Sequence, residues 1–260
     1  MIGGGWEVSL DALKPSNHSG LAQAINKAGF ASRSQATRLV AQGRVSWNGR
    51  VVRDPEWLVR EGDAILVDGE PLAAERMVYL MCHKPAGLVT TATDPKGRPT
   101  VYQCLEGMDL PHVGPVGRLD LASEGLLLFT NDTRWASTLL DPARRVPKTY
   151  HVRIDGSLDA AMAARMTAGI VDEGERLRAV SVKTLRMDGA CSWIEVVLHE
   201  GKNREIRRML GALGFEVLRL IRVRIGNLVL GDLAKGGVRS LAESEVEDLR
   251  RTRAPPRPRR

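Results

Sequence analysis

The sequence predicts an α+β protein in two parts: a small basic N-terminal module and a larger domain with a mixed, mainly antiparallel sheet and flanking helices. Two short helical patterns and a hairpin signal fill residues 19–73. Many strand-like runs follow over 74–249 without strict alternation of strand and helix. Charge also divides the chain, because residues 21–60 hold seven basic and two acidic side chains, whereas 250–260 hold six arginines and no acid. Such local basic charge favours a polyanionic partner.

The bulk composition is that of an ordinary globular chain. The 260 residues carry a net charge of +7, with 43% hydrophobic and 27% charged residues. No apolar run approaches the ~20 residues of a membrane helix, and the N-terminus lacks the pattern of a signal peptide. Three widely spaced cysteines, Cys82, Cys104 and Cys191, argue against a disulfide framework or a metal site. We therefore expect a cytoplasmic protein with no metal and no membrane association.

The N-terminal module is predicted to be two helices packed on a small antiparallel sheet. Residues 1–18 show no sustained period and are expected to be disordered. Residues 20–30 place apolar side chains at helical spacing, and a second short helix begins at Ser32 or Ser34 as its cap. The strands expected to follow lie in 44–52, around an Asn-Gly hairpin turn, and in 61–70.

Basic side chains decorate this module. They are Lys27, Arg33, Arg38, Arg44, Arg50, Arg53 and Arg60. On charge alone, a solvated face and an RNA-binding face are equally good interpretations. The order of helix, glycine turn and hairpin in SRSQATRLVAQGRVSWNGRVV resembles the S4-type RNA-binding domain. The resemblance implies that five of them contact structured RNA, namely Lys27, Arg33, Arg38, Arg44 and Arg50. Arg53 and Arg60 are not among these predicted contacts.

After a linker at 73–77, the larger domain is expected to alternate irregularly between strands and helices. The expected strands are 78–83, 87–91, 125–132, 148–154, 178–186, 191–198 and 215–225. The expected helices lie near 133–140, 158–168, 203–213 and 242–250. Neither G-x-x-x-x-G-K-[ST] nor G-x-G-x-x-G occurs, so no nucleotide cofactor is expected. The Pro- and Arg-rich residues 250–260 are predicted to form a disordered basic tail.

One unusual stretch, GRLDLASEGLLLFTND at 117–132, contains the strongest catalytic candidate. Asp120 precedes an apolar strand and should lie at the edge of the core, with Arg118 on the same side if the segment is extended. KNREIRR at 202–208 could bring a second arginine close. A carboxylate beside guanidinium groups stays ionised, as a nucleophile or general base requires. The alternative to a catalytic role is a structural one, in which Asp120 is a turn or cap residue.

A helical wheel over KNREIRRMLGALGF (202–215) separates its arginines. Arg204 and Arg208 fall opposite the apolar stripe, where they are available for phosphates. Arg207 lies at the boundary, where a partly buried arginine can hold a carboxylate with two hydrogen bonds. Solvated arginines are the alternative. Tyr150, one of only three tyrosines, is either a core residue or a ring on which a base can stack.

The motifs HKPAG, DPKGRPTV, GRLDLASEGLLLFTND, KTYHV and GKNREIRRML together resemble the RsuA/RluB-type family of ribosomal RNA pseudouridine synthases, over roughly residues 20–245. By position, Asp120 matches the family's catalytic aspartate, Tyr150 its active-site tyrosine and Arg207 the basic residue that pairs with the aspartate. Glu205 departs from the glutamine of many relatives, and we expect it to point elsewhere on the helix.

The resemblance implies isomerisation of a uridine to pseudouridine in ribosomal RNA, with no cofactor, by a monomer acting on a structured stem-loop in a ribosome assembly intermediate. The DPKGRPTV stretch favours large-subunit rRNA over small-subunit rRNA. Arg118, Lys148, Arg204 and Arg208 are the candidates for flanking phosphates. The alternatives are a catalytically silent RNA-binding or ribosome-assembly factor, and an aspartate-dependent nucleoside hydrolase. A hydrolase would usually need a second convergent carboxylate or a metal site; Glu124 is close in sequence but has no assigned role.

Overall fold

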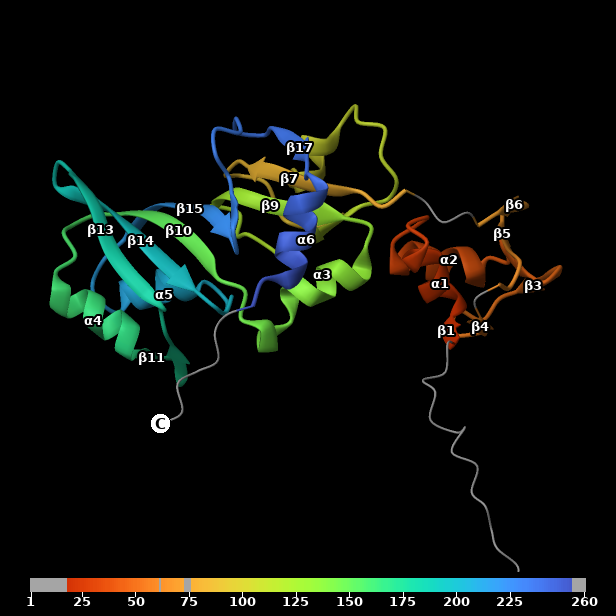
Figure 1. Cartoon of the computed structure of the whole chain (residues 1–260), viewed down its shortest axis with the longest axis horizontal. Coiled ribbons are helices and arrows are strands. Elements are labelled where there is room, and N and C mark those ends of the chain that lie inside the picture. The colour runs from red at the N-terminus through yellow and green to blue at the C-terminus, as the bar shows by residue number, and fades with distance from the viewer. Residues whose placement is uncertain (1–17, 61, 73–75, 254–260) are drawn as a thin grey trace, which may run out of the picture. The chain divides into compact units, whose positions relative to one another are not determined.

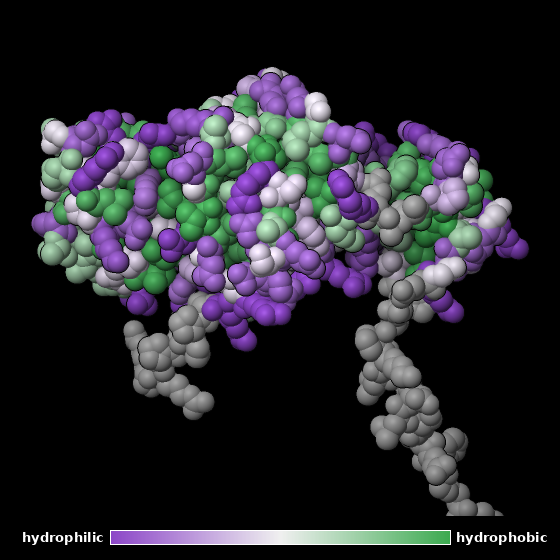
Figure 2. Space-filling view, turned by 45° about the horizontal axis from the view of Figure 1, so that its top comes forward, coloured by the Kyte–Doolittle hydropathy of each residue, from purple (hydrophilic) through white to green (hydrophobic). Residues whose placement is uncertain are grey.

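The computed structural model describes residues 18–60, 62–72 and 76–253. The chain divides into two compact units, Met1–Glu75 and Arg76–Arg260 (Figure 1). Hydrophilic side chains are interspersed with apolar ones on the surfaces of both (Figure 2). The expectation of disorder at 1–17 and 254–260 falls outside the described residues, as do 73–75 of the expected linker. Within the described parts, no helix is long and apolar enough to cross a membrane.

The smaller unit has the predicted pair of helices on a small sheet. Helix α1 spans Leu21–Lys27 and α2 spans Arg33–Ala41. Ser32 caps α2 in a capping box with Gln35, which decides between the two serines considered for this role. The strands are β1 (His18–Gly20), β2 (Val45–Trp47), β3 (Arg50–Val52), β4 (Leu58–Arg60), β5 (Ile65–Val67) and β6 (Glu70–Pro71). They form the order β3-β2-β5-β6, with β1 paired to β4, and the hairpin turns at Asn48-Gly49 with positive φ at both residues.

The larger unit is built on one sheet of nine strands, and this sheet is mixed and mainly antiparallel, as predicted. Its main order is β13 (Ser181–Asp188), β14 (Cys191–Leu198), β10 (Lys148–Ile154), β15 (Val217–Ile225), β9 (Glu124–Thr130), β7 (Tyr79–Lys84) and β17 (Val238–Ser240). Strand β8 (Gly114–Val116) pairs with β9, and β16 (Leu228–Val229) pairs with β15. All these pairings are antiparallel except that of β15 with β9, which is parallel and short.

Two apolar clusters hold helices against this sheet. Every residue of β9 is buried, and its side chains alternate between the clusters, because successive residues of a strand face opposite sides. One cluster includes α4 (Ala160–Ala168) and α5 (Glu205–Gly211). The other includes α3 (Thr133–Leu140) and α6 (Glu243–Arg251), which lie side by side in Figure 1. Short elements complete the unit: β11 (Ile170–Asp172), β12 (Glu175–Leu177) and 3₁₀ turns at Val101–Leu105 and Pro142–Arg144.

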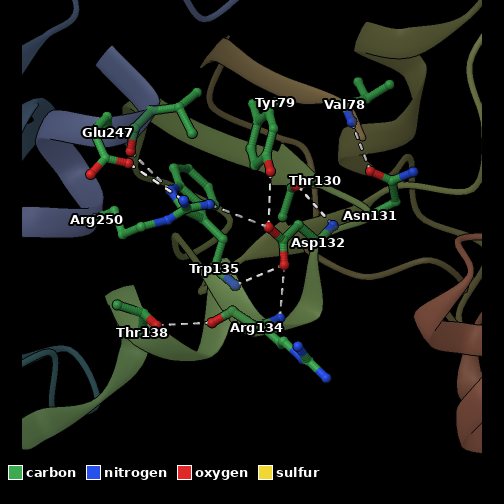
Figure 3. Close-up of polar contacts among 11 residues, drawn as sticks. Val78, Tyr79, Thr130, Asn131, Asp132, Arg134, Trp135, Thr138, Glu247 and Arg250 are labelled. Carbon is green, nitrogen blue, oxygen red and sulfur yellow. Dashed lines mark hydrogen bonds and ion pairs between the residues drawn. The ribbon is translucent and has the colours of Figure 1, made fainter. Parts of the chain in front are cut away.

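The polar residues that end the apolar strand β9 tie three elements together (Figure 3). The Asn131 side chain accepts a hydrogen bond from the Val78 backbone at 2.8 Å. Asp132 caps α3 by accepting from the Trp135 backbone at 2.9 Å, and it also accepts from the Tyr79 hydroxyl at 2.8 Å. Burial and the bond to Asp132 raise the pKa of Tyr79 to about 12. The FTND end of the motif therefore has a structural role.

Two predictions about elements are wrong. Residues 87–91 do not form a strand beyond an isolated bridge between Val89 and Thr100. Thr90 instead exchanges hydrogen bonds with the backbone of Leu119, accepting at 3.3 Å and donating at 2.8 Å. The predicted tail also begins too early. Helix α6 continues through Arg251, whose guanidinium donates to Glu247 one turn earlier at 2.8 Å.

Candidate active site

The loop between β8 and β9 presents Asp120. It begins at Gly117, which has φ +76, a conformation that strains other residues. It is closed by a hydrogen bond from the Ser123 amide to the Asp120 carbonyl at 3.0 Å. The Gly87 amide donates to the Leu121 carbonyl at 2.8 Å. The segment 87–91, which was predicted to be a strand, therefore supports this loop directly.

A buried cation anchors the loop from beneath. Lys84, at the end of β7, is 0% exposed. Its ammonium donates to the carbonyls of Ser123 at 2.7 Å, Asp120 at 3.1 Å and Pro85 at 3.0 Å, with Leu121 at 3.5 Å. Burial lowers the pKa of Lys84 to about 8, opposed mainly by nearby Cys104 and Asp120. Lys84 was not among the predicted site residues, although period-two alternation with buried Leu80 and Cys82 could have indicated an inward side chain.

Asp120 lines an open cavity of about 440 Å³. Arg118 reaches the cavity from the same loop, as predicted, and Tyr150 and Lys148 reach it from β10. Tyr150 is 7% exposed and belongs to the larger apolar cluster. It is therefore both a core residue and part of the cavity wall, so the two interpretations of its role are compatible. Asp120 is half-buried, and its carboxylate forms no hydrogen bond or ion pair within the described part of the chain. The volume suits a ligand of nucleotide size.

The predicted two-bond pairing of Arg207 with Asp120 is wrong for this structure. The Arg207 guanidinium donates instead to the carbonyls of Val217 at 3.0 Å and Ala122 at 3.4 Å. Burial lowers the pKa of Arg207, and the charge of Asp120 partly raises it again. Arg207 therefore supports the Asp120 loop through its backbone and attracts the carboxylate without contacting it.

Two further carboxylates lie near this site in different states. Glu124 accepts two hydrogen bonds from Arg219, at 2.7 and 2.9 Å, and pairs with Lys235 at 2.8 Å. These cations lower the pKa of Glu124 to about 2. Glu205 lines the cavity, contrary to the expectation that it points elsewhere. It is buried, which raises its pKa, and it accepts from the Lys202 amide at 3.2 Å.

The predicted phosphate contacts divide in the structure. Arg204 is exposed at the cavity rim, where it adopts a left-handed conformation with φ 48 just before α5. The prediction that Arg208 is available for phosphates is wrong, because Arg208 pairs with Asp172 and Glu175, each at 2.6 Å. The β11–β12 hairpin supplies both acids, and a helical wheel contains no information about such a distant partner.

In the smaller unit, Arg33, Arg38, Arg50 and Arg53 are exposed and Lys27 is half-buried. The guanidinium of Arg44 is held by Asp68 through hydrogen bonds of 2.7 and 2.5 Å, so it is less available to RNA than predicted. Arg33 lies 3.9 Å from Glu56, a contact too long and too exposed to hold it in place.

Arg222, like Lys84, lies at the site but was not among the predicted site residues. It lies in β15 directly opposite Tyr150 of β10, and it lines the cavity although it is only 4% exposed. Its position two residues after buried Leu220 could have indicated an inward side chain.

Comparison with known proteins decides which family this arrangement represents. The sequence model described as RNA pseudouridylate synthase matches residues 78–212, which include Asp120, Tyr150 and Arg207. The chain belongs to the RNA pseudouridylate synthase family. The S4 domain model matches residues 20–71 of this pseudouridine synthase, in agreement with the resemblance seen in its sequence.

Relatives and a solved structure agree with the family. The pseudouridine synthase is 37% identical over 228 residues to a protein of Aquifex aeolicus called an uncharacterized RNA pseudouridine synthase, covering 86% of this chain and 91% of that one. It is 36% identical to the ribosomal large subunit pseudouridine synthase B of Bacillus subtilis, covering 88% and 95%. A crystal structure of a pseudouridylate synthase matches with a TM-score of 0.64 and 31% identity, covering 89% of this chain and 99% of that one.

Proposed function

We propose that this pseudouridine synthase converts a specific uridine of large-subunit ribosomal RNA to pseudouridine, with Asp120 as the nucleophile. The observation that carries the proposal is the Asp120 carboxylate, unpaired within the described residues, in a cavity beside Tyr150. The choice of large-subunit RNA rests on the DPKGRPTV stretch and on the name of the Bacillus subtilis relative.

The reaction is an isomerisation. The bond between uracil N1 and ribose C1′ breaks, the uracil turns, and C5 bonds to the same sugar carbon. C5 gives up a proton and N1 takes one, so no oxidant or group donor is consumed. A base in a stacked helix cannot reach Asp120, so the uridine must leave its stack, and Tyr150 offers a ring against which the base packs.

The RNA is held by two groups of basic side chains in this proposal. Arg118 and Arg204 lie at the rim of the cavity and are exposed, which suits contacts to flanking phosphates. In the S4-type module, Lys27, Arg33, Arg38 and Arg50 form the proposed contacts to structured RNA, and Arg44 contributes less because of its pair with Asp68. The protein acts as a monomer in the cytoplasm on a ribosome assembly intermediate.

The experiment is to map pseudouridines in both ribosomal RNAs from cells that lack the gene and carry either the wild-type copy, Asp120→Asn or Asp109→Asn. Asp109 is an exposed carboxylate of the same unit and serves as the matched control. We expect one large-subunit site to disappear without the gene, to return with wild type and Asp109→Asn, and to stay absent with Asp120→Asn. Asp120→Asn should still bind the RNA in vitro.

The alternatives give different results. A site restored by Asp120→Asn would contradict the nucleophile assignment. RNA binding with no gene-dependent pseudouridine in either RNA would favour a silent assembly factor, and a gene-dependent site in the small subunit would correct the substrate. The hydrolase has less support, because the charge of Glu124 is neutralised by Arg219 and Lys235.

A further inference from the structure

Arg222 carries a charge for which the described part of the chain supplies no acidic partner. Its Nε donates to the Leu126 carbonyl at 2.7 Å, but its Nη2 is buried and has no hydrogen-bond partner there. It forms no ion pair within the same residues. A buried guanidinium without a counter-charge is costly to the fold. A group that arrives with the substrate can supply the missing acceptor.

The backbone at Arg222 is fixed more closely than that of an ordinary strand residue. Arg222 pairs with Gly125 at the short parallel junction of β15 and β9. A Cβ atom on Gly125 would lie 2.2 Å from the Arg222 carbonyl oxygen, a distance that no side chain tolerates. The glycine of the SEGLLLF motif therefore allows two backbones to meet directly behind this arginine.

Lys148 is the second cation of the same cavity. Its Nζ donates only to the Val146 carbonyl, at 3.1 Å, among the described residues. Burial and the nearby charge of Arg222 lower the pKa of Lys148 to about 8, and Glu205 opposes this effect without forming an ion pair. The other charged groups that line the cavity are Asp120, Arg118, Lys202 and Arg204.

We propose that Arg222 and Lys148 form an electrostatic site that stabilises the negative charge developed on the uracil ring during the isomerisation. The inference rests on the proposed function but not on the route taken by Asp120. If Asp120 attacks ribose C1′, the N1–C1′ bond breaks and its electron pair leaves with the uracil. If Asp120 adds to C6, the electrons of the C5–C6 double bond move toward O4.

The position of the two cations suits a ring oxygen better than a phosphate. Arg222 lies beside Tyr150, against which the base packs, and its free nitrogen is shielded from solvent. The phosphates stay on the RNA backbone at the rim, and only the base enters deeply. Donors fixed in advance where charge develops act strongly in such a water-poor site. Arg222 and Lys148 are thus catalytic residues in addition to Asp120.

The test uses RNA labelled with tritium at uridine C5, which is released when C5 loses its proton. Single-turnover rates with excess full-length enzyme, and the Kd for the RNA, are measured for wild type, Arg222→Gln, Arg222→Lys and Arg224→Gln. Arg224 is exposed on the same strand, so its variant is the matched control for lost charge. We expect Arg222→Gln to react about 10²–10³-fold more slowly, with Kd within about 3-fold. Arg222→Lys should recover part of the rate, and Arg224→Gln should resemble wild type.

Lys148 gives an independent test if Arg222→Gln does not fold. The wild-type single-turnover rate should fall as the pH rises through about 8 and Lys148 loses its proton. Lys84 also has a pKa of about 8 and is unchanged in Lys148→Arg, so any part of the fall that Lys84 causes is common to both proteins. Lys148→Arg should therefore lose a smaller fraction of its rate than wild type as the pH rises through about 8. Lys148→Met should be slow at every pH.

Four results have distinct meanings. An Arg222→Gln rate equal to that of Arg224→Gln would overturn the proposal, as would an equal fractional fall in rate through about pH 8 in Lys148→Arg and wild type. A loss confined to Kd would also overturn it and assign the two cations to a phosphate. A wild-type enzyme that releases no tritium from any ribosomal RNA would contradict the proposed function itself.

Discussion

Replacing Lys84 with methionine tests whether a buried cation holds the Asp120 loop. Methionine retains most of the apolar length of the side chain but removes the ammonium. Three backbone carbonyls within 3.1 Å then lose their donor: those of Ser123, Asp120 and Pro85. A hydrogen bond to a charged group contributes about 1.5–3 kcal/mol. The loss is partly offset, because the lowered pKa of Lys84 shows that its burial as a cation is itself costly.

The net destabilisation should be about 3 kcal/mol. For a unit of this size, that corresponds to a fall in Tm of about 6–12 °C. The rate should fall further than the stability alone implies, because a displacement of the carboxylate by about 1 Å can reduce turnover 10²-fold. We expect the folded variant at 20 °C to show about that loss in single-turnover rate, with RNA affinity little changed.

The assay combines thermal unfolding with the tritium-release measurement, and Lys96→Met is the control because Lys96 is exposed in a loop. The reasoning would be refuted if Lys84→Met unfolded within 2 °C of Lys96→Met and reacted at the same rate. A variant that unfolds earlier but reacts normally would show that Lys84 supports the fold without positioning Asp120.

Other perturbations test the surrounding structure. Glu124→Gln should lower the free energy of unfolding by about 3 kcal/mol at pH 7. The pKa of Glu124 is about 2 in the folded state and near 4.5 in the unfolded state, so this stabilisation is lost as the pH falls from 4.5 to 2. Urea unfolding of wild type and variant at a series of pH values measures it. Gly125→Ala should destabilise by about 3 kcal/mol or more, because its methyl group collides with the Arg222 backbone, as unfolding would show. Arg204→Gln should weaken RNA binding most at low salt, whereas Arg208→Gln should lower Tm with little change in the salt dependence of Kd.

Much of the fold follows from local patterns that the sequence displays. The bounds of β10 and β14 agree with the predicted 148–154 and 191–198, because their alternating apolar residues match strands with one buried face. Asp120 and Tyr150 share a cavity as the motifs indicated. These successes concern single strands and short motifs, whose patterns can be recognised without knowing which distant residues they contact.

The failures concern partners far apart in the sequence. The wheel over 202–215 assumed one continuous helix, but α5 begins only at Glu205, after Arg204 in a left-handed conformation. Arg204 is exposed, as the wheel predicted, but it lies before the helix rather than on it. The wheel could not foresee that Arg208 meets acids of a distant hairpin. The segment 87–91 has strand-like residues, yet side-chain bonds of Thr90 to Leu119 attach it to the Asp120 loop instead.

The environments of three acidic residues support the proposed choice of Asp120 as the nucleophile. Glu124 is held by Arg219 and Lys235, so its oxygens are occupied. Glu205 is buried, which raises its pKa, and it accepts a hydrogen bond from the Lys202 amide. Asp120 instead attracts Arg207 across a gap wider than an ion pair, because the arginine bonds to the loop backbone at Ala122. A nucleophile needs an ionised carboxylate with an oxygen open to the substrate. A two-bond clamp by Arg207 would occupy both oxygens, so the longer attraction is the arrangement better suited to the proposed attack by Asp120.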